Sequence, residues 1–139
     1  MMSGGRVFID TGIYIALLNK RDQYHRQALS LFGGPRPNWH TSILVWSEAY
    51  SWFLHRHGEN AARSFRTLTS SLEGLEILGT DLDHHRETLR LLDRLRGARL
   101  TYVDASSLAL MERHKIRTAW STDYHFGLTG ARVVPGGII

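Results

Sequence analysis

Four acidic residues of this chain occupy positions where a carboxylate could do chemistry. Asp10 and Asp123 each follow a short apolar run, Asp104 stands between an apolar run and a helix-like pattern, and Glu48 lies on a helix-like segment that otherwise lacks acids. Carboxylates held close together repel one another and raise one another's pKa, and a divalent cation removes this penalty. Mg²⁺ and Mn²⁺ prefer such oxygen ligands, and a site of this kind can activate water and clamp the oxygens of a phosphate. The four acids therefore predict metal-assisted cleavage of a phosphodiester.

Each acid alone also has a simple structural explanation. Aspartate is a favoured N-cap residue, so Asp10, Asp104 and Asp123 could each cap the helix or turn that follows. Glu48 could be exposed at the edge of its helix face, although no basic residue three or four positions away offers it an intrahelical ion pair. Four acids at matching positions fit these separate explanations less well than they fit one shared site.

The order of apolar runs and turn residues predicts strands that alternate with helices. Expected strands cover 6–9, 39–41, 75–78, 118–121 and 132–135, and expected helices cover 12–19, 22–32, about 42–57, 59–72, 81–95 and 105–114. LTYV at 100–103 is expected to be a short extended lead-in to the last helix. This alternation indicates an α/β fold with a mainly parallel sheet. Ligands of such sheets gather beyond the carboxyl ends of the strands, where Asp10 and Asp123 are expected.

Length and composition limit the class of protein. The 139 residues suit a single domain over 1–139. The lack of cysteine excludes disulfides, thiolate zinc sites and cysteine nucleophiles. The net charge of +4 comes mostly from arginine, which suits phosphate contacts, although many soluble domains carry a similar charge. Because the sequence shows neither a secretory signal nor an apolar run long enough to cross a bilayer, we expect a cytoplasmic protein with no membrane partner.

Three segments of the chain match one known family in order. They are VFIDTGIYIALLNKRDQYH near the start, TSILVWSEAY in the middle and LTYVDASSLALMERHKIRTAWSTDYHFGLTGARVVP towards the end. Together they span most of the chain and resemble the PIN-domain ribonucleases, in particular the VapC-like toxins of toxin–antitoxin pairs. The first Asp-Thr pair is a weak signal by itself, whereas the last block, with its T-x-D-x-H-F-like ending, is specific. Ser121 stands where the family often has threonine, so the hydroxyl before the last acid belongs to a serine.

The resemblance implies a PIN-like three-layer α/β/α sandwich with a mainly parallel central sheet, and an endoribonuclease that depends on Mg²⁺ or Mn²⁺. The family's catalytic and metal-binding acids fall on Asp10, Glu48, Asp104 and Asp123, and hydroxyls that orient ligands or substrate fall on Thr11 and Ser121. By analogy, an activated water attacks phosphorus in line and leaves a 5′-phosphate and a 3′-hydroxyl. The spacing of the acids does not say which carboxylate takes the proton from this water.

The resemblance also implies RNA as a partner, a small antitoxin protein that occupies the acidic cleft, and a homodimer. Other functions stay open from the sequence alone: a catalytically idle PIN-like module that binds RNA or protein, a nuclease acting on DNA or on a particular structure, and an RNA-processing enzyme that is not a toxin. The presence of all four acids argues against the idle module.

The remaining polar residues form no competing catalytic motif. The eight histidines include no HExxH sequence and no matching ligand set, which disfavours a zinc site. Ser106 and Ser107 lack the G-x-S-x-G turn of a hydrolase nucleophile. His125, two residues after Asp123, could contact RNA, and packing near the site is the favoured role.

Overall fold

Five short strands form a parallel sheet in the computed structural model, which describes residues 5–136. The strands are β1 (Arg6–Ile9), β2 (Asn38–Ser42), β3 (Glu76–Leu78), β4 (Thr118–Ser121) and β5 (Arg132–Pro135). Their order across the sheet is β3-β2-β1-β4-β5, and every pair is parallel. The central strand β1 is fixed in register on both sides, because Phe8 is opposite His40 of β2 and Ala119 of β4.

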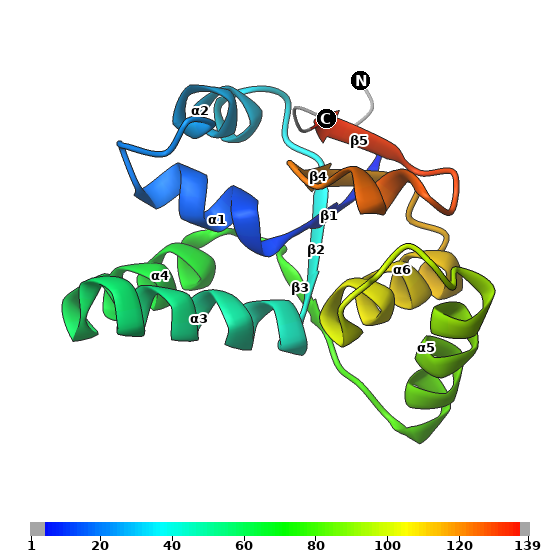
Figure 1. Ribbon diagram of the computed structural model, residues 1–139. Helices are drawn as coiled ribbons and strands as arrows, with labels where there is room; N and C mark the ends of the chain where they lie inside the picture. Colours follow the sequence, from blue (N-terminus) through cyan, green and yellow to red (C-terminus); the bar gives the residue numbers. More distant parts are fainter. Residues whose placement is uncertain (1–4, 137–139) are drawn as a thin grey trace.

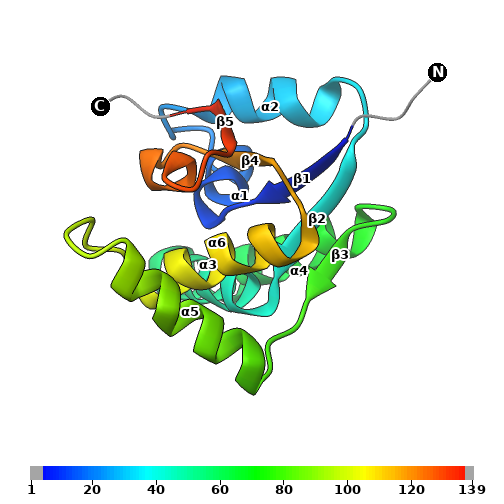
Figure 2. The ribbon, with the colours of Figure 1, turned by 90° about the vertical axis from the view of Figure 1, so that its right-hand side faces the viewer.

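Six helices cover the sheet. They are α1 (Thr11–Leu18), α2 (His25–Gly33), α3 (Ile43–His57), α4 (Glu59–Ser71), α5 (Leu82–Arg94) and α6 (Tyr102–His114), followed by the short 3₁₀ helix η1 (Tyr124–Gly127). Figure 1 shows α1 to α4 grouped on one side of the molecule, away from the α5–α6 pair. Figure 2 views the molecule from the side of α5 and α6, with α3 and α4 behind them. This arrangement confirms the predicted three-layer α/β/α fold.

The core lies on both faces of β1. Phe8 and Ile9 have no exposed surface, as expected for a central strand covered by helices on both sides. On one face Tyr14 of α1 meets Phe65 of α4 edge to face, with ring centroids 5.3 Å apart. Beyond the end of β4, Phe126 of η1 stacks on Phe8 at 6.3 Å. Burial of these large apolar side chains fixes how the helices lie against the ends of β1 and β4.

The direction of the chain reverses beside β1. The chain steps from β1 to β2 to β3 towards one edge, and then crosses back to β4 on the other side of β1. With right-handed connections, such a reversal places helices on both faces of the sheet. It also leaves a crevice between the carboxyl ends of β1 and β4, where open α/β sheets bind their ligands. The two strand ends are joined by the backbone N–H of Asp10, which donates to the carbonyl of Trp120 at 3.0 Å.

Two predicted helices begin more than one residue away from their observed starts, in both cases because a polar side chain bonds to the backbone. The 100–103 segment is not an extended lead-in: Thr101 caps α6 by accepting a hydrogen bond from the backbone N–H of Asp104, at 3.1 Å, so Tyr102 and Val103 are helical. The second helix begins at His25, because the carboxylate of Asp22 accepts from the N–H of Tyr24 and holds 22–24 in a turn.

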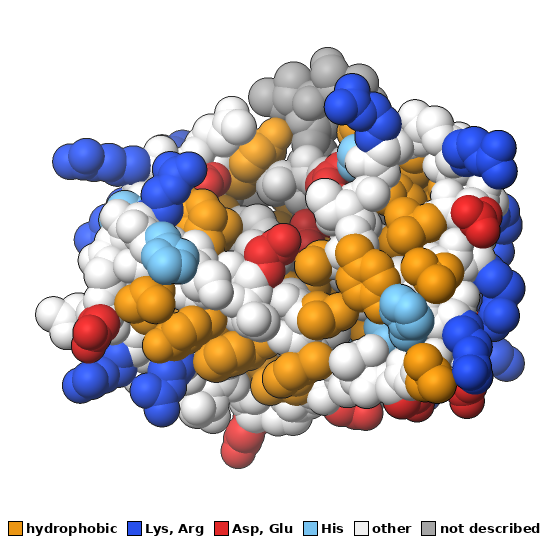
Figure 3. Space-filling model, turned by 60° about the horizontal axis from the view of Figure 1, so that its bottom comes forward, with side chains coloured by type: hydrophobic (Ala, Val, Ile, Leu, Met, Phe, Trp, Pro, Cys, Tyr) orange, Lys and Arg blue, Asp and Glu red, His pale blue; other side chains and the backbone are white. Residues whose placement is uncertain are grey.

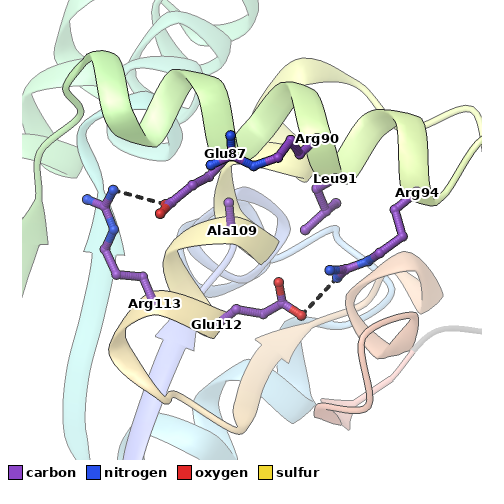
Figure 4. A pocket seen from close by; sticks show the side chains of 7 residues that line it. All are labelled: Glu87, Arg90, Leu91, Arg94, Ala109, Glu112 and Arg113. Carbon is purple, nitrogen blue, oxygen red and sulfur yellow. Dashed lines mark hydrogen bonds and ion pairs between the residues drawn. The ribbon is translucent and has the colours of Figure 1, made fainter.

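A cavity of about 470 Å³ opens between α5 and α6 (Figure 4). Two ion pairs cross it: Arg113 to Glu87 and Arg94 to Glu112, each at 2.9 Å. Its charged groups thus largely neutralise one another, and it lies against the second half of α6, away from Asp104 in the first turn. Among residues 5–136, no helix is both long and apolar enough to cross a membrane.

Candidate active site

The structure brings the four predicted acids to the carboxyl end of the sheet, from four different elements. Asp10 follows β1 directly, Asp123 follows β4, Asp104 lies in the first turn of α6, and Glu48 lies in the middle of α3. Helices α3 and α6 come into contact across this end of the sheet. Figure 3 shows acidic side chains around a central hollow on this face, bordered by hydrophobic side chains, with most lysines and arginines at the periphery. A negative hollow of this kind suits a cation better than an anion.

Asp10 is buried and held by Ser121. The side chain of Ser121, itself without exposed surface, donates its hydroxyl proton to Oδ2 of Asp10 at 3.0 Å. The same serine oxygen accepts from the backbone N–H of Asp123 at 3.0 Å. One hydroxyl therefore ties the acid after β1 to the loop after β4. Asp10 occupies the N-cap position of α1, yet its side chain makes no capping hydrogen bond, so its own capping explanation is wrong.

Thr11 holds Glu48 in the same way. Its buried side chain donates a hydrogen bond to Oε1 of Glu48, which links α1 to α3. Glu48 is exposed, so its other lone pairs remain open to solvent or to a ligand. The two hydroxyls predicted to orient ligands or substrate thus each contact an acid. Whether they also contact substrate stays a prediction.

Close packing at the start of α1 supports this geometry. Gly12 follows Thr11, and a Cβ atom at this position would lie 3.2 Å from the hydroxyl oxygen of Thr122. The absence of a side chain lets α1 approach the loop after β4, which carries Asp123.

Asp104 and Asp123 share a site with a histidine. One carboxylate oxygen of each acid and a ring nitrogen of His125 all lie within 4.8 Å of one another. Asp123 also caps η1, because its Oδ1 accepts from the backbone N–H of His125 at 3.0 Å. Its capping explanation is therefore confirmed and does not exclude a second role. For Asp104 capping is wrong, because Thr101 caps that helix.

The acids form one electrostatic group. Burial raises the pKa of Asp10 to about 7, and the charges of Asp104 and Glu48 add to the rise. Hydrogen bonds from the backbone N–H of Thr11 and from the hydroxyl of Ser121 oppose it. Burial also raises the pKa of Asp104, and so do the charges of Asp123 and Glu48. Each of the four acids thus interacts electrostatically with at least one of the others. Keeping all four ionised requires a compensating positive charge.

These residues fit a hard divalent ion. The donor set is mainly carboxylate oxygen, which Mg²⁺ and Mn²⁺ prefer. Nδ1 of His125 is buried, faces this cluster and has no hydrogen-bond partner among the described residues. The sequence pattern did not single out this histidine as a possible ligand, although it stands two residues after Asp123. The catalytic and metal-binding roles of the four acids stay predictions.

Comparison with known proteins gives one family. The model of the PIN domain matches residues 7–131. The 23S rRNA-specific endonuclease VapC20 of Mycobacterium tuberculosis is 29% identical over 125 residues, which cover 89% of this chain and 94% of the relative. The crystal structure of M. tuberculosis VapC20, described as a Sarcin-Ricin loop cleaving toxin, superposes with a TM-score of 0.82 at 27% identity, covering 90% of this chain and 95% of that one.

More distant structures share the fold. A toxin–antitoxin complex from Klebsiella pneumoniae gives a TM-score of 0.70 at 22% identity, covering 95% of this chain and 99% of that one. FitAcB from Neisseria gonorrhoeae gives 0.68 at 13% identity, covering 91% of this chain and 95% of that one. At these identities the likeness concerns the fold alone.

The pKa of Asp10 predicts how the metal-free protein responds to pH. Because the folded-state pKa of about 7 lies above the ordinary value of 3.8, the folded state binds more protons between these values, and the stability that this provides is lost as pH rises towards and through 7. In EDTA, the melting temperature of the wild type should fall more between pH 5 and pH 8, about the window set by these pKa values, than that of Asp10→Asn. Thermal melts of both proteins at each pH test this. An equal pH response would show that Asp10 does not titrate in this range.

Proposed function

The chain belongs to the PIN domain family, and from this premise we propose that it is an endoribonuclease that depends on Mg²⁺ or Mn²⁺ and acts as the toxin of a toxin–antitoxin pair. The observation that carries the proposal is the convergence of Asp10, Glu48, Asp104 and Asp123 at the reversal point of the sheet. Burial and the charges of neighbouring acids raise the pKa of Asp10 and the pKa of Asp104. A site that only bound RNA would gain nothing from four carboxylates, because RNA carries negative charge on each phosphate.

The residues of the chain divide the work of phosphodiester cleavage. A bound divalent ion would supply Lewis acidity, activate water and offset the charge of the phosphate. Asp10, Asp104 and Asp123 would hold the ion, and the Ser121 hydroxyl would keep Asp10 oriented towards it. Glu48 would bind the ion or accept a proton from water at the open side of the site, and its exposure and its hydrogen bond from Thr11 support this role.

RNA is the favoured polymer on the strength of the M. tuberculosis relative, which is named as an rRNA endonuclease. The arginine-rich composition supports contact with a nucleic-acid backbone, since guanidinium groups bind phosphate oxygens in pairs. An RNA-processing enzyme that is not a toxin would use the same site. A neighbouring reading frame that encodes an antitoxin would distinguish a toxin from such an enzyme.

The proposed toxin role also implies a protein partner, an oligomeric state and a cellular location. The partner would be a small antitoxin, in line with the likeness to a toxin–antitoxin complex. We place it over the acidic hollow because of the negative charge there. A homodimer and a cytoplasmic location belong to the same proposal.

We expect cleavage of RNA to require a divalent ion and the acid after β1. Single-stranded or structured RNA should be cut with Mg²⁺ or Mn²⁺, cleavage should stop with EDTA, and Asp10→Asn should lower the rate by at least about 100-fold because it removes a ligand charge. Asp83→Asn is the matched control, because Asp83 is an exposed acid on α5 that pairs with Arg86.

The product ends give a second readout of the same assay, since the proposed chemistry leaves 5′-phosphate and 3′-hydroxyl groups. Undiminished cleavage in metal-free buffer, or by Asp10→Asn, would contradict the proposal. Loss of cleavage in Asp83→Asn would show that the assay reports something other than this site.

A cognate antitoxin should inhibit by occupying the acidic hollow, with an arginine of the antitoxin placed among the carboxylates. The unbalanced negative charge of the four acids gives such an arginine a favourable position. Crosslinking of the complex, read by mass spectrometry, should place the antitoxin beside Asp10 and Asp104. Crosslinks confined to the cavity between α5 and α6, or to another remote face, would refute this mode of inhibition.

A further inference from the structure

His125 is held so that one particular ring nitrogen faces the acids. It lies in η1, two residues after Asp123, with its side chain 19% exposed. Its Nε2 lies 3.0 Å from the carbonyl oxygen of Ala98. A carbonyl only accepts hydrogen bonds, so Nε2 must carry the proton and donate it. In the neutral ring, Nδ1 then has a free lone pair.

The loop that presents the carbonyl of Ala98 has an unusual backbone. The residues on either side, Gly97 and Arg99, have φ values of 97° and 59°. A positive φ is uncommon for a residue other than glycine, and it is kept where the surrounding structure requires it. This loop connects α5 to α6 and therefore orients His125 from an element that carries none of the four acids.

Nδ1 lies close to an acceptor atom of Asp123. Nδ1 lies 2.8 Å from Oδ1 of Asp123, within the cluster that also contains a carboxylate oxygen of Asp104. Nδ1 is buried and has no hydrogen-bond partner among the residues described. A ring nitrogen lone pair and a carboxylate oxygen repel each other at this distance. The contact is therefore stable only with a proton on Nδ1 or with a cation bound to both atoms.

We propose that Nδ1 of His125 is a ligand of the divalent ion, together with the carboxylates of Asp104 and Asp123, so that the site is a mixed nitrogen and oxygen site. The proposal rests on the proposed function only in assuming that a divalent ion is bound. Adjacent ligands of an octahedral ion with bonds of about 2.0–2.1 Å are about 2.9 Å apart, which agrees with the spacing of Nδ1 and Oδ1. Histidines that bind metal almost always donate their other N–H to a carbonyl or carboxylate, as His125 does to Ala98.

A nitrogen ligand changes which ion the site prefers. Mg²⁺ is a hard ion that favours oxygen, whereas imidazole suits the transition metals, and affinity for a nitrogen-containing site rises from Mn²⁺ along the first-row series. The site should therefore bind Mn²⁺ more tightly than Mg²⁺. The variant His125→Gln replaces the nitrogen donor with an amide oxygen and should reduce this preference by about tenfold, the scale expected for a changed metal environment.

Pulsed electron paramagnetic resonance of the protein loaded with Mn²⁺ tests the ligand directly. The wild type should show modulation from a directly bound nitrogen nucleus, and labelling of histidine with the heavier nitrogen isotope should change its frequency. This readout needs no substitution, so it does not depend on whether a variant folds. The modulation should disappear in His125→Gln and persist in His55→Gln, since His55 is exposed in the last turn of α3.

The possible outcomes test the role of His125 as a ligand separately from the proposed ribonuclease function. Mn²⁺ bound without nitrogen modulation would overturn the proposal, because Nδ1 would then not be bonded to the ion. Modulation that survives in His125→Gln would overturn it as well, because another histidine would then be the ligand. Failure to bind Mn²⁺ at all would contradict both this inference and the proposed function. Nitrogen modulation in a protein that cuts no RNA would support the ligand and contradict the function.

Discussion

Repulsion among carboxylates at one end of the sheet is the constraint on which the rest of this structure depends. Asp10 is buried, and desolvation and neighbouring charges raise its pKa to about 7. Desolvation and neighbouring charges also raise the pKa of Asp104. The remainder of the fold must hold these groups together against that repulsion. The parallel sheet does so through backbone hydrogen bonds, such as the one from the N–H of Asp10 to the carbonyl of Trp120. In such a site the energetic cost of the metal-free state becomes affinity for a cation.

The topology explains why this end of the sheet was available. The strand order reverses between β1 and β4, and a reversal of this kind leaves a crevice beyond the carboxyl ends of the two strands. Buried hydroxyls then fix the acids without adding charge: Ser121 holds Asp10, and Thr11 holds Glu48. The loop between α5 and α6 contributes from a third direction through Ala98 and His125. Orientation thus comes from neutral donors, which leaves the negative charge of the hollow for the ligand.

The sequence predicted the parts of the site that local pattern determines. Asp10 and Asp123 follow apolar strands, so their location at the sheet edge followed from strand periodicity and the crossover rule. The start of α6 was placed too late, because Tyr102 and Val103 favour strands and the cap at Thr101 outweighed that preference. The bond from Thr11 to Glu48 depends on how α1 packs against α3, which no local pattern specifies. The orientation of His125 depends in the same way on a loop nearly thirty residues away, since the two bonded positions are separated by 27 residues.

The central claim, that the four acids form one repelling group neutralised by a cation, is tested most directly by thermal melts of the wild type and Asp104→Asn with and without Mg²⁺. The substitution removes one charge and keeps the shape, and the cap of α6 is unaffected because Thr101 provides it. The metal-free variant should be at least as stable as the wild type, by up to about 1 kcal/mol, and Mg²⁺ should stabilise the wild type by mass action and the variant much less. If both proteins melt alike at every Mg²⁺ concentration, Asp104 belongs to no metal site and the account is wrong.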